Sequence, residues 1–489
     1  MFGRRSFKSD ESFLEKISIG AIGTRRVFEH LRQQGHAPIE LERGSMSYKI
    51  WKSIKIKRIR VPDILLLNAN RRVESRAKTV LEITMSHSFS NHERSWDNGL
   101  ADEDFVALVG IHRIGERPID WEADQLVQYV SVRDLRAVYL TDSIVKEKPK
   151  GSQEGFEERI TWLASTSSAN GTIKQVTPKK LQYERLIDGR TITLQLTKSK
   201  ISLLPQVAVG DSVIENQIVA SVVPVTQLIP LENTATAKVY IQQLQSSSQS
   251  ERYTAAKALY YFDSAEVRSS LIKKIQDDKD HIYVRMDAAA SLARHNDPAG
   301  YAFIEECLEK PYLEDQLEAV IVLAEIATSA ANNILLRVLR NQQYHAEVRA
   351  GAAWALGEIR NKSALQTLVQ SFNEIADVVR IEAARALAKI AQDNLNDVLS
   401  LIPTSDVNEL PGIAWALSQA ANFSVDQLVN VLQGDDTRRW VSYILGSQQP
   451  QVYINQIETL RQADPEVYFA VTVLWQIMNS WIYNLEMYG

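Results

Sequence analysis

The sequence predicts a multidomain protein, with an α/β domain in residues 1–150, a small β module in residues 165–228 and an α-solenoid in residues 235–489. Three observations lead to this fold class. Strand-like apolar segments follow a single amphipathic helix in the first region, and short β-branched segments separated by turn residues fill the second. In the C-terminal region, a sequence phrase recurs about every 30 residues, which is the signature of stacked helical repeats.

Length and composition narrow the class of protein. At 489 residues the chain is too long for one hydrophobic core, and its 45% hydrophobic and 24% charged residues are typical of a globular protein. No apolar run approaches the ~20 residues of a membrane span, and no apolar leader follows Met1, so we expect a cytoplasmic protein. The single cysteine, Cys307, excludes an internal disulfide framework.

The α/β domain is expected to begin with a helix from Ser12 to about Gln34, which ends at the break 35–38. A series of strands should follow, because apolar segments alternate there with turn residues. These expected strands are residues 48–59, 62–67, 79–85, 105–111 and 137–140.

Positive charge is concentrated at the start of the chain. Residues 1–60 contain fourteen Lys or Arg against six Asp or Glu, a balance of +8 within a chain of net charge -5. Such a basic segment attracts phosphates and predicts nucleic-acid binding. An edge strand protected by lysines fits the same pattern. The cations that alternate with apolar residues, as on a half-buried strand with a basic outer face, are Lys52, Lys55, Lys57, Arg58 and Arg60.

In the β module, Gly210-Asp211 and Asn216 supply two tight turns between short β-branched strands. This pattern resembles the hammerhead of a barrel-sandwich hybrid, the fold of biotinyl and lipoyl carrier domains. A carrier domain needs a modifiable Lys between small or Met residues at a hairpin tip, and the module has no such Lys. The resemblance therefore implies a structural spacer or a docking module.

The repeated phrase of the solenoid ends in a leucine in all seven of its copies. Small Ala and Gly residues before that leucine allow two helices to pack closely. Seven positions before the leucine, two copies carry Gln316 or Leu410 and the other five carry an arginine. An arginine near the start of a helix can pair with a neighbouring acid or carbonyl, so we interpret the arginines as structural. The leucines are Leu259, Leu292, Leu323, Leu356, Leu387, Leu417 and Leu445, and the arginines are Arg252, Arg285, Arg349, Arg380 and Arg438.

The phrase resembles HEAT repeats, in particular the HEAT-like class found in phycobilisome lyases and many bacterial scaffold proteins. The resemblance covers about half of the chain and implies a solenoid surface that binds a protein partner. The chain would then be a scaffold or a purely structural protein–protein adaptor. The lyase class implies an alternative, a phycobilin lyase or lyase chaperone that acts on phycobiliproteins.

Two acids in the α/β domain have the pattern of a metal-dependent nuclease. Asp63 follows Pro62 at the start of one expected strand, and Glu82 lies on another. This order resembles the PD-(D/E)xK nuclease superfamily, in which two acids bind Mg²⁺ and a following Lys orients the attacking water. The resemblance implies that Asp63 and Glu82 bind the metal, that Thr84 takes the position of the Lys, and that Glu29 supplies a third acid.

The position of the Lys is where the chain departs from that superfamily, because Thr84 carries no charge. Lys78 shares its face of the expected strand but would lie roughly 20 Å away along a continuous strand. Cleavage of DNA or RNA and binding without cleavage both stay open.

The polar loop 86–100 follows the expected strand and contains His87 and His92. The loop offers no convincing third ligand for zinc, so we do not expect a zinc site. It is either the rim of an active site or a solvent-exposed loop anchored by Trp96.

Overall fold

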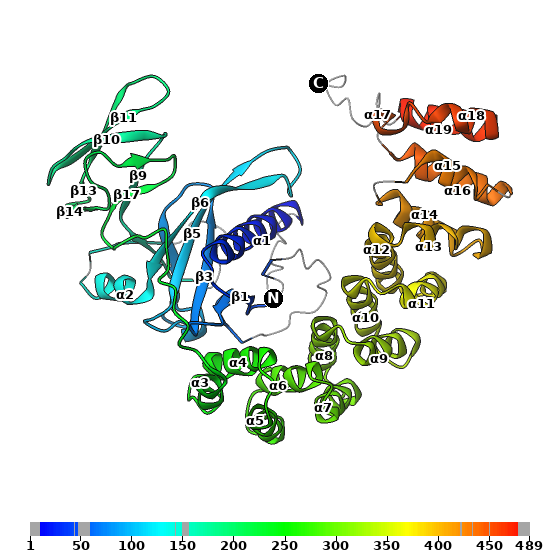
Figure 1. Cartoon of the computed structure of the whole chain (residues 1–489), viewed down its shortest axis with the longest axis horizontal. Coiled ribbons are helices and arrows are strands. Elements are labelled where there is room, and N and C mark those ends of the chain that lie inside the picture. The colour runs from blue at the N-terminus through cyan, green and yellow to red at the C-terminus, as the bar shows by residue number, and fades with distance from the viewer. Residues whose placement is uncertain are drawn as a thin grey trace, which may run out of the picture. The chain divides into compact units, whose positions relative to one another are not determined.

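The computed structural model describes residues 10–43, 45–46, 59–141, 143–148, 156–420, 423–432, 434–448 and 450–477. The chain divides into two compact units, Met1–Val267 and Arg268–Gly489. The first contains a mixed α/β region with several sheets, and the second is helical throughout its described residues (Figure 1). The expected fold class is therefore confirmed.

The first unit is built on a sheet of order β1-β2-β3-β5-β6, in which β3 and β5 are parallel and the other neighbours antiparallel. Helix α1 packs on this sheet through Val27 and Leu31, which are fully buried. At Gly23 the helix approaches β3 so closely that a Cβ would lie 2.5 Å from the Cβ of Ala77. These elements are α1 (Asp10–Gln33), β1 (Pro38–Glu40), β2 (Ile64–Leu66), β3 (Arg71–Lys78), β5 (Phe105–Arg113) and β6 (Trp121–Ser131).

Three of the six expected elements of this domain are confirmed. Helix α1, β2 and β5 lie where the sequence places them. Almost all of the expected basic strand 48–59 lies outside the described residues. The strand expected at 137–140 is wrong: these residues end helix α2 (Val132–Leu140), because Ser131 caps its start by accepting a hydrogen bond from the Asp134 N–H at 3.0 Å.

The strand expected over residues 79–85 is wrong in its first half. Strand β3 ends at Lys78, the chain bends, and β4 (Ile83–His87) then begins a second sheet of order β4-β8-β7. The sequence alone did not reveal β3 because Arg71–Lys78 is mostly charged, yet its flanking strands keep it half-buried or better. The partners of β4 are β8 (Glu158–Trp162) and β7 (Val145–Glu147).

The β module forms its own sheets but shares a core with β4 and α2. Ile83 and Leu135 belong to the same buried cluster as Ile173 and Val213. The two expected turns have left-handed backbones, with φ 95° at Gly210 and 62° at Asn216. The strands are β9 (Ala164–Thr166), β10 (Gly171–Val176), β11 (Lys180–Arg185), β12 (Thr191–Gln195), β13 (Thr197–Lys198), β14 (Ile201–Ser202), β15 (Leu204–Pro205), β16 (Ser212–Val213) and β17 (Ile218–Ser221).

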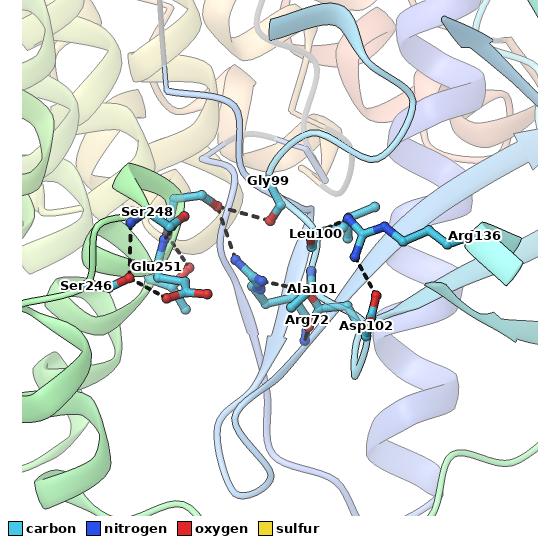
Figure 2. Close-up of polar contacts among 12 residues, drawn as sticks. Arg72, Gly99, Leu100, Ala101, Asp102, Arg136, Ser246, Ser248 and Glu251 are labelled. Atoms are coloured by element: carbon cyan, nitrogen blue, oxygen red, sulfur yellow. Dashed lines mark hydrogen bonds and ion pairs between the residues drawn. The ribbon is translucent and has the colours of Figure 1, made fainter. Parts of the chain in front are cut away.

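Two helices of the first unit, α3 (Ala237–Gln243) and α4 (Gln249–Ala258), dock on the α/β domain. The Tyr240 hydroxyl donates to the Leu67 carbonyl at 2.7 Å. The Arg72 guanidinium donates to the Ser250 hydroxyl at 3.2 Å and pairs with the buried Asp104 carboxylate at 2.7 Å. Figure 2 shows Arg72 beside Ser248 and Glu251, where α4 begins. The first repeat phrase is therefore bonded to the sheet and not only to other helices.

In the second unit the phrase helices contact one another in chain order, as expected for stacked repeats, and α19 continues the series (Figure 1). They are α6 (Ile282–Arg294), α8 (Leu313–Ile326), α10 (Ala346–Ile359), α12 (Asp377–Asp393), α14 (Leu410–Ser418) and α16 (Asp435–Gly446), followed by α19 (Pro465–Ile477). The helices that alternate with them are α5 (Ala265–Gln276), α7 (Pro298–Glu309), α9 (Ser329–Arg340), α11 (Leu365–Gln370), α13 (Leu395–Leu399), α15 (Val425–Val429), α17 (Pro450–Tyr453) and α18 (Ile457–Ala463).

Pro411, inside one repeat phrase, and Trp475, in the last described helix, depart from the repeat pattern, and each has a local explanation. Pro411 lies in the first turn of α14, where a missing N–H costs no helical hydrogen bond. Trp475 is buried and donates its indole N–H to the Leu445 carbonyl at 2.9 Å. Among the described residues, no helix is both long and apolar enough to cross a bilayer.

Candidate functional sites

The first candidate site is the β2–β3 hairpin, where Asp63 and Glu74 come together. Asp63 immediately precedes β2, is buried, and accepts a hydrogen bond from the backbone N–H of Ser75 at 2.7 Å. Burial raises the pKa of Asp63 well above its usual range, and the nearby carboxylates of Glu74 and Glu42 raise that pKa further. A buried acid with a raised pKa beside other carboxylates is a candidate for a binding or catalytic site.

Cations lie on the same strand as Glu74. Side chains alternate along β3, so Glu74, Arg76 and Lys78 share one face. Arg76 pairs with Glu74 at 3.0 Å. Arg60, which is described although its basic neighbours are not, donates to the Glu93 carbonyl at 3.1 Å, and burial lowers the pKa of its guanidinium.

Lys78 does not lie 20 Å from Thr84, and this expectation is wrong. The bend after β3 brings the Lys78 ammonium to 3.0 Å from the Thr84 hydroxyl and 3.3 Å from its carbonyl. Burial, followed by the positive charges of Arg76 and Arg159, lowers the pKa of Lys78 to about 8. Thr84 is itself buried in β4.

Glu82 is not the acid that faces Asp63. It lies just before β4, whose sheet excludes β2, and its carboxylate pairs with Arg159 at 2.7 Å. Glu74 takes that place, because Ile64, the residue after Asp63, pairs directly with Val73. The signal that could have identified it is the acid–x–cation spacing of Glu74 and Arg76, eleven residues after Asp63.

Glu29, the third acid predicted from the sequence, does not lie in the β2–β3 hairpin. Glu29 is exposed on α1, two residues from the buried Val27, and so points away from the sheet that Val27 covers. Within the described ranges no group of three or more His, Cys, Asp or Glu side chains could hold a metal ion. Asp63 and Glu74 therefore supply two carboxylates, which suit Mg²⁺ or Mn²⁺ only with further oxygen ligands from water or substrate.

Most of the basic residues expected to bind nucleic acid are not described by the structure. Lys52, Lys55, Lys57 and Arg58 lie outside the described residues, and Arg60 is adjacent to the acidic hairpin.

The loop after β4 is held in place by Trp96. Trp96 is buried and lies edge-on to Trp162, with ring centroids 5.0 Å apart. The buried His87 ring lies 3.4 Å from the Trp96 N–H, and the Glu157 carboxylate accepts a hydrogen bond from the Phe89 N–H at 2.9 Å. Trp96 therefore anchors the loop, whose role as the rim of an active site stays a prediction.

The phrase arginines bond to carbonyls or form ion pairs with acids near the ends of neighbouring helices. Arg285 donates to the Ile275 carbonyl at 3.0 Å, and Arg252 to the Ser246 carbonyl at 2.8 Å. Arg349 pairs with Glu374, and Arg438 binds Asp464 through two hydrogen bonds. Gln316, which replaces the arginine in one copy, donates to the Leu308 carbonyl at 2.9 Å.

The second candidate site is a groove of about 920 Å³ in the second unit. Its walls come from α12, α14 and the turns that precede them. Ile375 is 95% exposed, Val407 63% and Ile381 49%, so three branched aliphatic side chains share one exposed surface. The lining residues are Phe372, Asn373, Glu374, Ile375, Arg380, Ile381, Ala384, Arg385, Val407, Asn408, Pro411, Gly412 and Trp415.

The sequence contains a signal for this groove that the periodicity of the repeats does not capture. Ile375 and Val407 each lie in a turn between two helices, where polar residues are the rule. An aliphatic residue in such a turn has no helix face to bury it, so its presence predicts exposed apolar surface.

Comparison with known proteins supports the repeat assignment. A family model described as HEAT repeats matches residues 237–315 and 303–388. No curated protein matches the chain. The HEAT-repeat assignment therefore rests on that family model for residues 237–388.

Several solved structures are similar to the chain at low identity. The complex of CpcE and CpcF of phycocyanin lyase from Nostoc sp. PCC7120 is 19% identical over 51% of this chain and 98% of that chain, with a TM-score of 0.26. An archaeal HEAT-like repeats protein from Thermococcus onnurineus NA1 is 16% identical over 44% of this chain and 97% of that chain, with a TM-score of 0.22. A computationally designed armadillo repeat protein for modular peptide recognition is 20% identical over 43% and 99%, with a TM-score of 0.25.

Proposed function

We propose that the chain is a HEAT-repeat scaffold whose second unit binds a protein partner. The observation that carries this proposal is the groove between α12 and α14, in which Ile375, Val407 and Ile381 are exposed together. Burying exposed apolar surface is the main driving force of protein association, at roughly 25 cal/mol per Å². Helical repeats offer many side chains on one extended surface, and this suits them to holding a partner.

Site-specific photo-crosslinking in cells tests the scaffold function. A benzoyl-phenylalanine at position 375 should trap one discrete protein, because that side chain projects from the groove. The matched control is the same residue at position 469, where Phe469 is also largely exposed but lies on α19, away from the groove residues. Equal products from both positions, or none from 375, would contradict the proposal.

A second candidate function is metal-dependent binding or cleavage of nucleic acid by the α/β domain. The observation that favours it is the meeting of Asp63 and Glu74 on paired strands, with Arg76 and Lys78 on the same strand. A bound Mg²⁺ would neutralise phosphate charge and polarise the scissile bond. Arg76 and Arg60 would bind phosphate oxygens, and Lys78, with its pKa of about 8, could hold or release a proton near neutral pH.

The nuclease hypothesis is tested by incubating plasmid, linear and single-stranded DNA or RNA with Mg²⁺ or Mn²⁺. If the hairpin is the site, Asp63→Asn and Glu74→Gln should each abolish cleavage, whereas Glu82→Gln should leave it within about twofold. Loss of cleavage in Glu82→Gln alone would restore the pair suggested by sequence. Binding without cleavage would leave a recognition domain, and absence of both would leave the scaffold function alone.

The lyase alternative rests only on the resemblance of the repeats. Cys307, the one cysteine of the chain, is buried, and burial raises the pKa of its thiol to about 11. A thiol with such a pKa is almost entirely protonated at neutral pH and is a poor nucleophile. Cys307 is therefore not proposed as a nucleophile, which bears on capture of a chromophore by this chain itself and not on a lyase or chaperone role toward another protein.

A further inference from the structure

We infer that the edge strand β12 of the β module binds an acidic, extended segment of a partner protein, which adds to the sheet as a further antiparallel strand. This inference concerns the first unit and does not depend on the groove between α12 and α14. It goes beyond the proposed scaffold function, because it gives the chain a second binding surface of a different kind.

One side of β12 has no strand beside it. Its sheet has the order β12-β11-β10-β16, so β12 pairs with β11 alone among the described strands. Strands β10 and β11 of this sheet lie at the end of the first unit away from α3 and α4 (Figure 1). Two main-chain hydrogen bonds of 2.9 Å flank the β11–β12 ladder: the Arg185 N–H donates to the Arg190 carbonyl, and the Leu196 N–H to the Lys179 carbonyl.

These two bonds determine which backbone groups of β12 face the open side. Bonded residues of an antiparallel ladder recur at every second position, so Ile192 and Leu194 turn their N–H and C=O groups to β11. Thr191, Thr193 and Gln195 turn theirs to the open side. An added strand would therefore meet three residues that each offer one donor and one acceptor.

The open edge lacks the features that usually block strand addition. Proline, lysine and bulges protect exposed edges of natural sheets. Other edges of the first unit carry such residues, as Pro38 in β1, Pro205 in β15 and Lys146 in β7 show. Strand β12 contains only Thr, Ile, Leu and Gln, and its pairing with β11 has no register shift. The chain therefore leaves this edge available for pairing.

One face of β12 continues the core of the module. Ile192 and Leu194 pair with Tyr183 and Leu181, which are fully buried, and so lie on the apolar face of the sheet. They pack against this core but are themselves only half-buried. Apolar side chains of an added strand, placed opposite Ile192 and Leu194, would extend the same apolar layer.

The surroundings of β12 are basic. Residues 171–202 contain seven Lys or Arg against two Asp or Glu, a balance of +5 in a chain of net charge -5. Both acids are already paired, Glu184 with Lys174, and Asp188 with Arg185 and Arg190. Four cations of this segment form no ion pair within the part of the chain that the structure describes. They are Lys179, Lys180, Lys198 and Lys200.

The position of Lys180 shows where a partner carboxylate would lie. Lys180 pairs with Gln195 and shares the polar face of the sheet with it and with Thr193. The remaining acids of this sheet, Asp211 and Glu215, flank β16 at the opposite edge, about 14 Å away at the usual strand spacing. Charge complementarity therefore selects a strand with acids on the polar face and apolar residues on the other.

A basic surface also attracts the phosphates of nucleic acid. The backbone groups of β12 favour a polypeptide instead. Thr191, Thr193 and Gln195 present carbonyl acceptors as well as N–H donors, and these match another main chain, whereas a phosphate offers only acceptors.

Fluorescein-labelled peptides of nine residues, titrated with the full chain and followed by fluorescence polarisation, provide the probes. One alternates Glu with Val, a second alternates Lys with Val, and a third has the composition of the first in two separate blocks. A single-stranded DNA of nine nucleotides carries negative charge without peptide groups. The alternating acidic peptide should bind at least tenfold more tightly than the other three. Equal binding of the two acidic peptides, preference for the Lys peptide or the DNA, or binding of none would overturn the inference.

N-methylated peptides test the hydrogen bonds themselves. Directly opposed residues share a face, so the glutamates of the peptide lie opposite the three outward residues of β12 and point their N–H groups at them. N-methylation of the glutamates should therefore abolish binding, and N-methylation of the valines should change affinity less than threefold. The reverse pattern, or equal effects, would contradict antiparallel strand addition.

Two substitutions at one position test the edge of the protein. Thr193→Pro removes an outward N–H without breaking a hydrogen bond to β11, so the sheet should still fold. Thr193→Val keeps that N–H, and both variants lose the hydroxyl that accepts from Gln182. Thr193→Pro should bind the acidic peptide at least tenfold more weakly and Thr193→Val within twofold of wild type. Equal binding by both variants would place the peptide elsewhere.

Charge and location are tested by three further variants. Lys180→Gln should weaken binding of the acidic peptide at least threefold, whereas Lys238→Gln removes the same charge from exposed α3 and should change it less than twofold. Ile375→Asp in the groove should also change it less than twofold. Loss of binding in Ile375→Asp, with none in Thr193→Pro, would overturn this inference and leave the scaffold function of the groove intact.

Discussion

The two units differ in how they pair their buried charge. The repeats bury small apolar side chains and bring most of their arginines to helix ends, where carbonyls and acids satisfy them. The α/β domain instead buries Asp63 among other acids, Lys78 against Thr84, and the pair Arg72–Asp104 beside α4. Both units bury charge, but in the repeats Lys274 pairs with Asp280 and Glu382 pairs with Arg385. Buried charge costs free energy unless it is paired, so Asp63, which lies beside other acids, marks the place that can do chemistry.

The largest expected effect comes from breaking the buried ion pair of the first unit. Arg72→Ala leaves the Asp104 carboxylate, whose side chain is 2% exposed, without its cation and should destabilise the unit by about 3–5 kcal/mol. Urea unfolding of the full chain, followed by tryptophan fluorescence, measures this change. Arg133→Ala removes a surface pair with Glu103 and should cost less than about 1 kcal/mol. Equal losses of unfolding free energy in Arg72→Ala and Arg133→Ala would show that burial does not determine the cost of breaking an ion pair.

A smaller effect is expected from crowding the repeat framework. A Cβ at Gly357 in α10 would lie 2.6 Å from the Cα of Ala386 in α12, so Gly357→Val should cost about 1–3 kcal/mol in the second unit. Gly20 in α1 has no neighbour within 4 Å of such a Cβ, and Gly20→Ala should stabilise by about 0.5–1 kcal/mol. Thermal unfolding measures both, and a stabilised Gly357→Val would show that the two helices do not approach so closely.

The fold of the repeats could be predicted from local sequence, whereas the meeting of Asp63 and Glu74 could not. Each phrase contains its own helix and its closing leucine, and most copies contain the arginine, so the solenoid could be predicted from the chain alone. Glu74 was missed because its strand, Arg71–Lys78, has no apolar alternation, and only its neighbours β2 and β5 make it a strand. The bend after Lys78, which moved Glu82 and Thr84 to another sheet, likewise depends on contacts distant in sequence.

Replacing Asp63 should change the stability of the fold by a smaller amount, and the direction of that change should depend on pH. The pKa of Asp63 is higher in the folded than in the unfolded state. The acid therefore favours folding fully only below its unfolded pKa of about 3.9, and this contribution is lost as the pH rises through its folded-state pKa. At pH 7 the acid therefore destabilises the fold, and Asp63→Asn should raise the melting temperature there but not near pH 3. Asn can still accept the Ser75 N–H. A lower melting temperature at pH 7 would mean that Asp63 is a structural acid instead.

The central claim is that partner binding resides in the groove of the repeats and not in the α/β domain. The most direct test uses the partner protein that crosslinking at position 375 identifies. This partner is purified and titrated by calorimetry into wild type, Ile375→Asp, Phe469→Asp and Asp63→Asn. We predict at least tenfold weaker binding for Ile375→Asp and changes below twofold for the other two variants. Unchanged binding by Ile375→Asp, together with loss in Asp63→Asn, would contradict the claim and move recognition to the acidic hairpin.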